Sequence, residues 1–272
     1  MMLRFSLRRQ EPILRVHVLR KPALSSELLL TLEQLLKKAK ITYDFKLPEM
    51  SLSQEVLLCF GGDGTLLAAL RHPSNSLCFG IHVGHLGFLT ATNLEGAPHF
   101  LEALTQGHYQ IQNHLMLEGQ IAKQHFLCAN DIVVTKKDYS GMLGLQLFID
   151  GILANTYQVD GLIFATPLGS TAYNISVGGS VVHPLCQNIL ITPIAPHSLY
   201  QRPIILNDQA HLEIVPKQSC SVVIDGQVRY TLKSKQSLQI YKSIRQAKLI
   251  QPLEYNYFKV LKEKFSWGTS HP

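Results

Sequence analysis

The sequence predicts two domains of different class: an α/β domain at the N-terminus, followed by a β-rich domain. Up to about residue 106, short apolar runs alternate with amphipathic helical patterns. From residue 107 onward, short strand-like segments are separated by turn signals that include three Asp-Gly pairs. We therefore expect an α/β domain over residues 1–106, a β-rich domain over 107–250, and a C-terminal segment, 251–272, that returns to the first domain.

Length and composition agree with a folded chain of this size. The 272 residues are enough for two modest domains, and 46% of them are hydrophobic, which excludes wholesale disorder. No apolar stretch approaches the roughly 18 residues of a membrane-spanning helix. The basic N-terminal residues are not followed by the apolar core of a secretory signal.

Charge and cysteine content narrow the class of protein. The 25 Lys and Arg against 19 Asp and Glu give a net charge of +6, spread along the chain rather than gathered in a run. This distribution suits a small anionic ligand and does not indicate nucleic-acid binding. The five cysteines lack the spacing of a zinc site. We expect a cytoplasmic protein with no membrane or nucleic-acid partner and no metal held by its own side chains.

The first domain is predicted as an open parallel sheet of the Rossmann type. Residues 55–60 form a continuous apolar run, typical of a parallel strand that is buried on both faces. Ser25 or Ser26 is a suitable N-cap for the helix that follows the first strand. The expected strands are residues 13–19, 55–60 and 77–83, and the expected helices are residues 25–40 and 66–71.

The second domain is predicted to be β-sandwich-like. Asp150-Gly151 lies between two apolar segments and is a strong hairpin signal, and Asp160-Gly161 and Asp225-Gly226 are further expected turns. One helix is expected over residues 169–178. The expected strands are residues 143–149, 152–158, 189–194, 211–215, 221–224, 228–232 and 238–241.

Residues 61–65, Gly-Gly-Asp-Gly-Thr, mark the corner between a buried strand and a helix. Glycines there let a ligand approach the backbone, and the helix N-terminus favours phosphate. A carboxylate would repel that phosphate, so Asp63 suits a sugar hydroxyl or a magnesium ion held through water. The alternative is a tight turn in which Asp63 caps the helix. The candidate phosphate-binding residues are Gly61, Gly62, Gly64 and Thr65.

Two further segments carry polar groups suited to a nucleotide. In residues 160–173, a buried strand leads through a Pro-Gly corner into a helix start rich in hydroxyls, where Ser170 or Thr171 is alternatively a simple N-cap. Asn130-Asp131 directly precedes an apolar strand. An amide beside a carboxylate can hold ribose hydroxyls, although an ordinary Asx turn has the same sequence.

Taken in order, these motifs resemble the NAD kinase family. The resemblance covers about residues 53–230 and rests on six segments: 61–65 (GGDGT), 80–89 (GIHVGHLGFL), 130–131 (ND), 160–173 (DGLIFATPLGSTAY) with 178–179 (GG), 192–198 (TPIAPHS) and 225–227 (DGQ). Lipid kinases of the diacylglycerol type and phosphofructokinases share the Gly-Gly-Asp-Gly element but lack the Thr-Pro-x-Gly-Ser-Thr-Ala-Tyr segment.

The resemblance implies transfer of the γ-phosphoryl of ATP, or of polyphosphate, to the 2′-hydroxyl of the adenosine ribose of NAD. The product would be NADP, Mg²⁺ or another divalent cation would accompany ATP, and the chain would form a homo-oligomer, a dimer or tetramer. Asp63 is implied as the catalytic proton acceptor. The implied NAD contacts are Asp63, Gly64, Asn130, Asp131, Asp160, Thr171, Ala172, Tyr173, Ser176 and Gln227.

The sequence departs from the family pattern at several positions, and two rival functions remain open. His82 and His85 stand where many relatives carry Asn and Arg. A lipid kinase with the same glycine turn would phosphorylate diacylglycerol instead of NAD. A dinucleotide sensor would bind NAD or NADP without phosphoryl transfer, but it has no need of a carboxylate such as Asp63 beside the phosphates.

Overall fold

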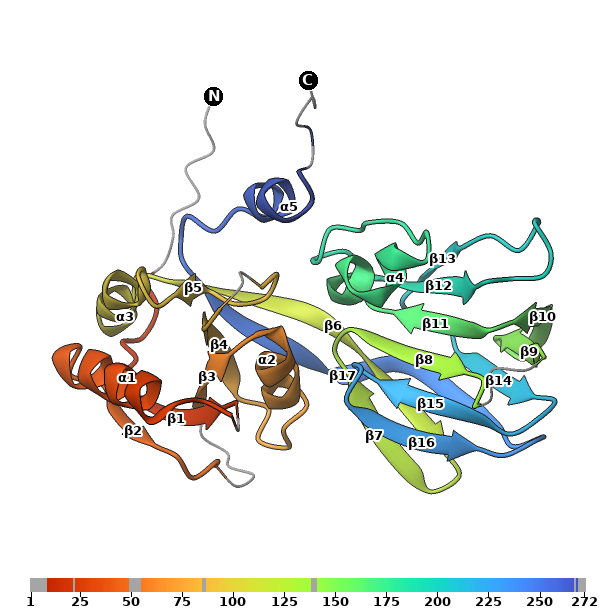
Figure 1. The fold of residues 1–272 in the computed structure, drawn as a ribbon, viewed down its shortest axis with the longest axis horizontal. Coiled ribbons are helices and arrows are strands. Elements are labelled where there is room, and N and C mark those ends of the chain that lie inside the picture. Colours follow the sequence, from red (N-terminus) through yellow and green to blue (C-terminus); the bar gives the residue numbers. More distant parts are fainter. Residues whose placement is uncertain are drawn as a thin grey trace. The chain divides into compact units, whose positions relative to one another are not determined.

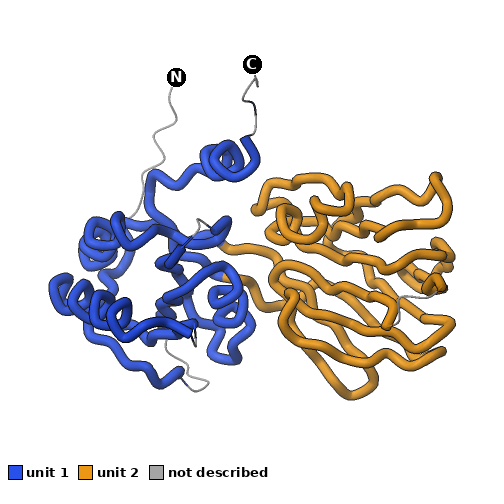
Figure 2. Tube along the Cα trace, in the orientation of Figure 1, with its two compact units in different colours: residues 1–112, 248–272 blue, residues 113–247 orange. Residues whose placement is uncertain are grey.

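The computed structural model describes residues 9–21, 23–48, 55–84, 87–137, 141–266 and 268. The chain divides into two compact units, residues 1–112 with 248–272, and residues 113–247 (Figure 2). The domain boundaries expected at residues 106 and 250 stay predictions. Within the described part of the chain, no helix combines the length and apolar character needed to cross a membrane.

Unit 1, as we call residues 1–112 and 248–272, is built on a parallel sheet (Figure 1). Its strands run in the order β2-β1-β3-β4, and the end of β17 adds to β4 through Leu249. The elements are β1 (Arg15–Arg20), α1 (Ser26–Lys38), β2 (Thr42–Asp44), β3 (Val56–Gly61), α2 (Asp63–Leu70), β4 (Leu77–His82), β5 (Thr92–Asn93), α3 (Ala97–Thr105) and α5 (Tyr257–Phe265).

Local sequence explains these elements. Every residue of β3 and β4 is buried, as expected for central parallel strands. Leu58 and Phe60 face the cluster that contains residues of α1 and α3, while α2 covers the opposite face (Figure 1). The side chain of Ser25 accepts a hydrogen bond from the Leu28 N–H, so the predicted N-cap is confirmed.

Unit 2, residues 113–247, is a β-sandwich. One layer is an antiparallel sheet in the order β13-β12-β11-β8-β15-β16, and the other contains β10, β9, β14, β17, β6 and β7. Inward side chains of both layers form one apolar core. The elements are β6 (Gln110–Ile121), β7 (Gln124–Cys128), β8 (Asp131–Thr135), β9 (Leu143–Ile149), β10 (Ile152–Val159), β11 (Gly161–Ala165), η1 (Leu168–Thr171), α4 (Tyr173–Ser176), β12 (Asn188–Ile194), β13 (Ile204–Asn207), β14 (Leu212–Pro216), β15 (Cys220–Ile224), β16 (Val228–Leu232) and β17 (Leu238–Gln251).

Two of the three predicted Asp-Gly turns close hairpins. Asp150-Gly151 joins β9 to β10 with φ angles of 51° and 79°, and Asp225-Gly226 joins β15 to β16 with 48° and 67°. Left-handed backbone at both positions matches the twist of the strands. Asp160-Gly161 instead carries the chain from β10 in one layer to β11 in the other. The turn expected there is therefore a crossing between sheets.

The helix expected over residues 169–178 is broken. A 3₁₀ turn, η1, ends at Thr171, and the short α4 begins after Ala172, whose φ and ψ of −88° and −131° are not helical. Neither piece has a side-chain cap, so the capping role considered for Ser170 or Thr171 is wrong. The Ser170 hydroxyl bonds the backbone of Val182 instead, since that loop folds back over η1.

Candidate functional site

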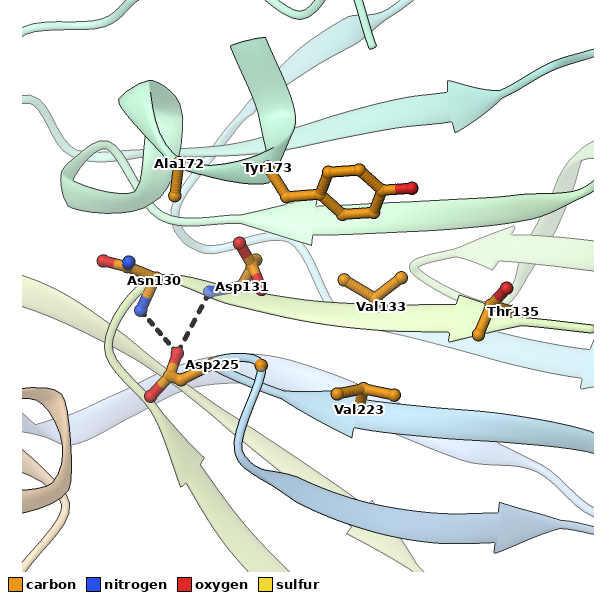
Figure 3. Close-up of a pocket in the computed structure, with 9 residues that line it drawn as sticks. Asn130, Asp131, Val133, Thr135, Ala172, Tyr173, Val223 and Asp225 are labelled. Carbon is orange, nitrogen blue, oxygen red and sulfur yellow. Dashed lines mark hydrogen bonds between the residues drawn. The ribbon is translucent and has the colours of Figure 1, made fainter. Parts of the chain in front are cut away.

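A pocket of about 400 Å³ opens on the outer face of the six-stranded sheet of unit 2 (Figure 3). This volume is within the range of small-molecule sites, about 300–1,000 Å³. Strands β8 and β15 form one wall, and the segment that joins η1 to α4 lies opposite (Figure 3). The lining residues are Asn130, Asp131, Val133, Thr135, Ala172, Tyr173, Val223, Asp225 and Gly226.

The alternation of β8 determines which of its side chains reach the pocket. Ile132 and Val134 lie in the core of the sandwich, while Asp131, Val133 and Thr135 line the pocket. A single strand thus supplies the apolar core with one set of side chains and the pocket with the other.

The turn that leads into β8 is held by the carboxylate of Asp225. One oxygen accepts hydrogen bonds from the N–H groups of Asn130 at 2.7 Å and Asp131 at 3.1 Å (Figure 3). The other oxygen accepts from the N–H group of Ala129 at 3.1 Å. Asp225 is only 7% exposed. The sequence indicates only a turn at Asp225, because the amides that its carboxylate binds lie far away in the sequence.

The same turn is also held from its carbonyl side. The Thr166 hydroxyl donates to the Ala129 carbonyl at 2.6 Å, and the Thr166 N–H donates to the Asn130 carbonyl at 2.9 Å. Gly169 packs directly on Asn130: a Cβ added at Gly169 would lie 2.1 Å from that carbonyl oxygen. The positions of Asn130 and Asp131 are therefore set by groups from two other segments, the β15–β16 turn and residues 166–169.

Asp131 is a buried carboxyl group. Its burial, followed by the nearby charge of Asp225, raises its pKa from 3.8 to about 7. Beside it, the Oδ1 atom of Asn130 is buried without a hydrogen-bond partner. A carboxyl group with a raised pKa and an amide oxygen without a hydrogen-bond partner in the lining of one pocket are typical of a binding site. Hydrogen-bond donors of a ligand can pair with both groups.

Asp63 begins α2 in unit 1, and its carboxylate binds backbone amides. The Phe88 N–H donates to Oδ2 at 2.7 Å, and the Leu89 N–H donates to Oδ1 at 3.1 Å. The N-cap is Gly62 and has no side-chain cap, so the alternative in which Asp63 caps the helix is wrong. A carboxylate has about four acceptor positions, so two remain for other groups.

The glycines around Asp63 allow close packing. A Cβ added at Gly61 would lie 2.5 Å from Thr65 Oγ1, and one added at Gly87 would lie 2.1 Å from Asp63 Oδ1, while Gly62 has open space around it. The first N–H groups of a helix lack intrahelical partners. In α2, however, the Thr65 N–H already donates to the Gly62 carbonyl at 3.0 Å. Anion binding at this corner therefore stays a prediction.

Comparisons with known proteins bear on both units. Residues 129–252 match the ATP-NAD kinase C-terminal domain family. An NAD kinase of Helicobacter pylori strain Shi470 is 48% identical over 215 residues, which are 78% of this chain and 76% of the relative. The chain belongs to the NAD kinase family. An NAD kinase of Helicobacter hepaticus is 40% identical over 243 residues, which are 82% of this chain and 81% of that relative.

Solved structures of NAD kinases and related enzymes share the fold. A yeast NADH kinase complexed with NADH has a TM-score of 0.83 at 23% identity, and the match covers 97% of this chain and 90% of the other. An NAD kinase from Archaeoglobus fulgidus in complex with ATP has a TM-score of 0.78 at 26% identity, over 93% and 98%. The predicted fold class, with its α/β and β-rich parts, is confirmed.

Four residues that the NAD kinase resemblance implied lie together in the pocket: Asn130, Asp131, Ala172 and Tyr173. The other implied contacts in unit 2 are not among its lining residues, and their roles stay predictions. They are Asp160, Thr171, Ser176 and Gln227.

Asp160 has a partner that sequence reasoning missed. Lys136 Nζ lies 2.6 Å from Asp160 Oδ1, and the Asp160 carbonyl accepts a hydrogen bond from the hydroxyl of Thr135, a pocket residue, at 3.2 Å. Asp160 is thus tied to the end of β8. The Lys136-Lys137 pair in the sequence gave no sign of this contact.

His82 is one of the two histidines that depart from the pattern that the resemblance implies. It is 6% exposed, and its Nδ1 lies 3.3 Å from the Thr90 hydroxyl. Burial lowers its pKa, and so does the charge of Lys264, while contacts with Thr92 and Asp63 act in the opposite direction. His82 is therefore neutral at pH 7. His85 lies outside the described residues.

Gly169→Ala is expected to weaken NAD binding about tenfold or more, because the added methyl displaces the Asn130 backbone rather than a flexible side chain. Isothermal titration with NAD measures the effect. Gly144→Ala is the control, since its methyl would meet the flexible Lys217 side chain at 2.8 Å. Equal affinities for the two variants would show that the Gly169–Asn130 contact does not position the pocket.

Asp131→Asn is expected to stabilise the protein at pH 8 and to have little effect near pH 4. The folded pKa of about 7 exceeds the ordinary 3.8, so the wild type loses stability as pH rises between these values. At pH 8 the raised pKa of Asp131 lowers the free energy of unfolding of the wild type by on the order of 2–4 kcal/mol. Urea denaturation at both pH values measures it, and a difference between the proteins that does not grow with pH would contradict the raised pKa.

Proposed function

We propose that this chain transfers the γ-phosphoryl of ATP to the 2′-hydroxyl of the adenosine ribose of NAD, giving NADP. The observation that carries the proposal is the pairing of Asp131, a buried carboxyl with a raised pKa, and Asn130, with its unpartnered amide oxygen, in a nucleotide-sized pocket. Membership of the NAD kinase family supplies the reaction type.

In unit 2, we assign the adenosine end of NAD to the pocket. Sugar hydroxyls need both donors and acceptors, which an amide and a carboxyl supply together. Asp131 gains a donor from the ligand and is then better able to ionise. Tyr173, 46% exposed, has a ring face available for stacking against a base. Asp160, Thr171, Ser176 and Gln227 are proposed as further contacts along the dinucleotide.

In unit 1, we assign Asp63 to the reacting hydroxyl. A bond forms between the ribose 2′-oxygen and the γ-phosphorus, the bond from that phosphorus to the β,γ-bridging oxygen breaks, and the hydroxyl proton passes to the carboxylate as ADP leaves. A carboxylate is a weak base for an alcohol. A loose transition state, however, requires little early deprotonation, so orientation of the hydroxyl contributes most.

The phosphates of the donor are assigned to the glycine corner, residues Gly61, Gly62, Gly64 and Thr65, where open space around Gly62 lets a ligand approach the backbone. Mg²⁺ would accompany the donor as part of the ATP complex and would supply neutralisation of the charge on the transferring group. We also infer that the protein is cytoplasmic and forms a homo-oligomer, a dimer or tetramer. Light scattering measures the mass of the assembly, which is a multiple of the 30.5 kDa of one chain.

One assay separates this function from its rivals. The purified protein is incubated with Mg²⁺ and either ATP or polyphosphate, with NAD or diacylglycerol as acceptor. We expect NADP from NAD and no phosphatidic acid. Phosphorylation of diacylglycerol alone would identify a lipid kinase, and NAD binding without product from either donor would identify a sensor.

A further inference from the structure

The Phe88–Leu89 segment, whose amides bind Asp63, is also held from its other side. Gln251, the last residue of β17, donates from Nε2 to the Leu89 carbonyl at 3.1 Å. Gln251 is 1% exposed, and Leu89 is 4% exposed. The Leu89 backbone thus joins two side chains far apart in the sequence: its N–H donates to Asp63, and its C=O accepts from Gln251.

Among the described residues, the side-chain amide of Gln251 makes one hydrogen bond, the one to the Leu89 carbonyl. Its Oε1 atom is buried without a hydrogen-bond partner, whereas Nε2 meets the Leu89 carbonyl. The orientation is fixed, because exchanging the two atoms would place oxygen against oxygen. An apolar side chain would avoid the cost of a buried, unpartnered oxygen. The glutamine is therefore explained by its hold on Leu89 and not by packing alone.

Helix α5 holds the neighbouring residue. The ring of Phe265 lies 5.1 Å from that of Phe88, and Lys264 Nζ lies 5.8 Å from the centre of the Phe88 ring. The helix is anchored by a side-chain cap from Asn256 and by the buried Leu261. The C-terminal segment therefore contacts both Phe88 and Leu89, the two residues whose N–H groups bind Asp63.

We propose that Gln251 is a positioning residue for Asp63, and that helix α5 supports it through Phe88. By holding the Leu89 carbonyl, Gln251 keeps the Phe88 and Leu89 amides aligned on the carboxylate, which fixes the direction of its remaining acceptor positions. This inference rests on the proposed role of Asp63 as the group that orients the reacting hydroxyl. Small errors in such an orientation are costly for the rate.

The test compares Gln251→Met with Gln201→Met. Gln201, in unit 2, also donates from Nε2 to a backbone carbonyl at 3.1 Å, that of Thr156, and also has a buried Oε1 without a partner. Two quantities are measured: steady-state kinetics with NAD and ATP, and hydrogen exchange of the peptide that contains residues 87–90. Phe265→Ala, at a 39% exposed position, tests the second contact without altering the core.

For Gln251→Met we expect kcat to fall about tenfold, with KM for NAD within twofold of the wild type, and faster exchange at residues 88–89. Phe265→Ala should show the same pattern more weakly, and Gln201→Met should show neither change. Unchanged exchange, or unchanged kcat, in Gln251→Met would overturn the proposal.

Asp63→Ala separates this failure from a failure of the proposed function. If Asp63→Ala is inactive while Gln251→Met is fully active, only the positioning role of Gln251 is wrong. If Asp63→Ala itself is active, the assigned role of Asp63 is wrong.

Discussion

Asp63→Ala is expected to abolish turnover, with kcat lower by a factor on the order of a hundred to ten thousand, while NAD still binds. The variant removes the group that orients the 2′-hydroxyl and receives its proton. It also releases the Phe88 and Leu89 amides, which the carboxylate accepts at 2.7 and 3.1 Å.

The contact with two amides makes Asp63→Asn an informative companion. We expect it, too, to bind NAD nearly normally and to lose turnover. An asparagine has one acceptor oxygen, so its NH₂ group would face one of the two backbone donors. Faster exchange at residues 88–89 would therefore accompany the loss of turnover.

The control for both variants is Asp44→Asn. Asp44 lies in the same unit, and its carboxylate also accepts a backbone amide, that of Lys46 at 2.8 Å. It should retain wild-type kinetics. The catalytic assignment would be wrong if Asp63→Ala kept kcat within tenfold of the wild type, or if Asp44→Asn lost activity to the same extent.

Asp225→Ala is expected to lower the free energy of unfolding by about 3–5 kcal/mol and to abolish measurable NAD binding. Three backbone N–H groups, of Ala129, Asn130 and Asp131, lose their acceptor in a buried turn. The turn then keeps only the contacts of its carbonyl groups with Thr166, so the two side chains that it presents to the pocket are held less firmly.

Asp150→Ala provides a matched control for this variant. Asp150 occupies the corresponding left-handed position of the β9–β10 hairpin, with φ of 51° against 48° for Asp225, but its side chain accepts a single N–H, from His211 at 2.9 Å. We expect a loss of about 1 kcal/mol there. Urea denaturation measures both, and equal losses would show that the three amide bonds of Asp225 contribute little.

Much of the fold was predictable, because its signals are local. The apolar runs of β3 and β4 indicate central parallel strands, Ser25 caps α1, and Asp150-Gly151 closes a hairpin. The break at Ala172 was not predictable from the helical pattern of residues 169–178. The Ser170 hydroxyl just before it bonds the backbone of Val182, a contact that a local pattern does not carry. Strand β17 also extends to Gln251, well beyond the predicted end at residue 241.

The candidate site likewise contains some residues that the sequence makes visible and others that it does not. Asn130 and Asp131 are visible in the sequence as a polar pair directly before an apolar strand, which alone fits an Asx turn equally, and the resemblance to the NAD kinase family implies their contact with NAD. The residues that position them are not visible in this way. Asp225 and Thr166 act on a turn 37 to 97 residues away, and Gln251 acts on Leu89 across 162 residues. Hydrophobic periodicity carries no information about such distant pairs.

The most direct test of the central claim follows the phosphoryl group itself. Wild-type protein and Asp63→Ala are each incubated with NAD, Mg²⁺ and ATP labelled in its γ-phosphate, and the position of the label in the product is determined. We predict that the wild type places the label on the 2′-oxygen of the adenosine ribose, giving NADP, and that Asp63→Ala binds NAD but transfers no label. Label at any other position, or none from a folded wild-type protein that binds NAD, would contradict the account.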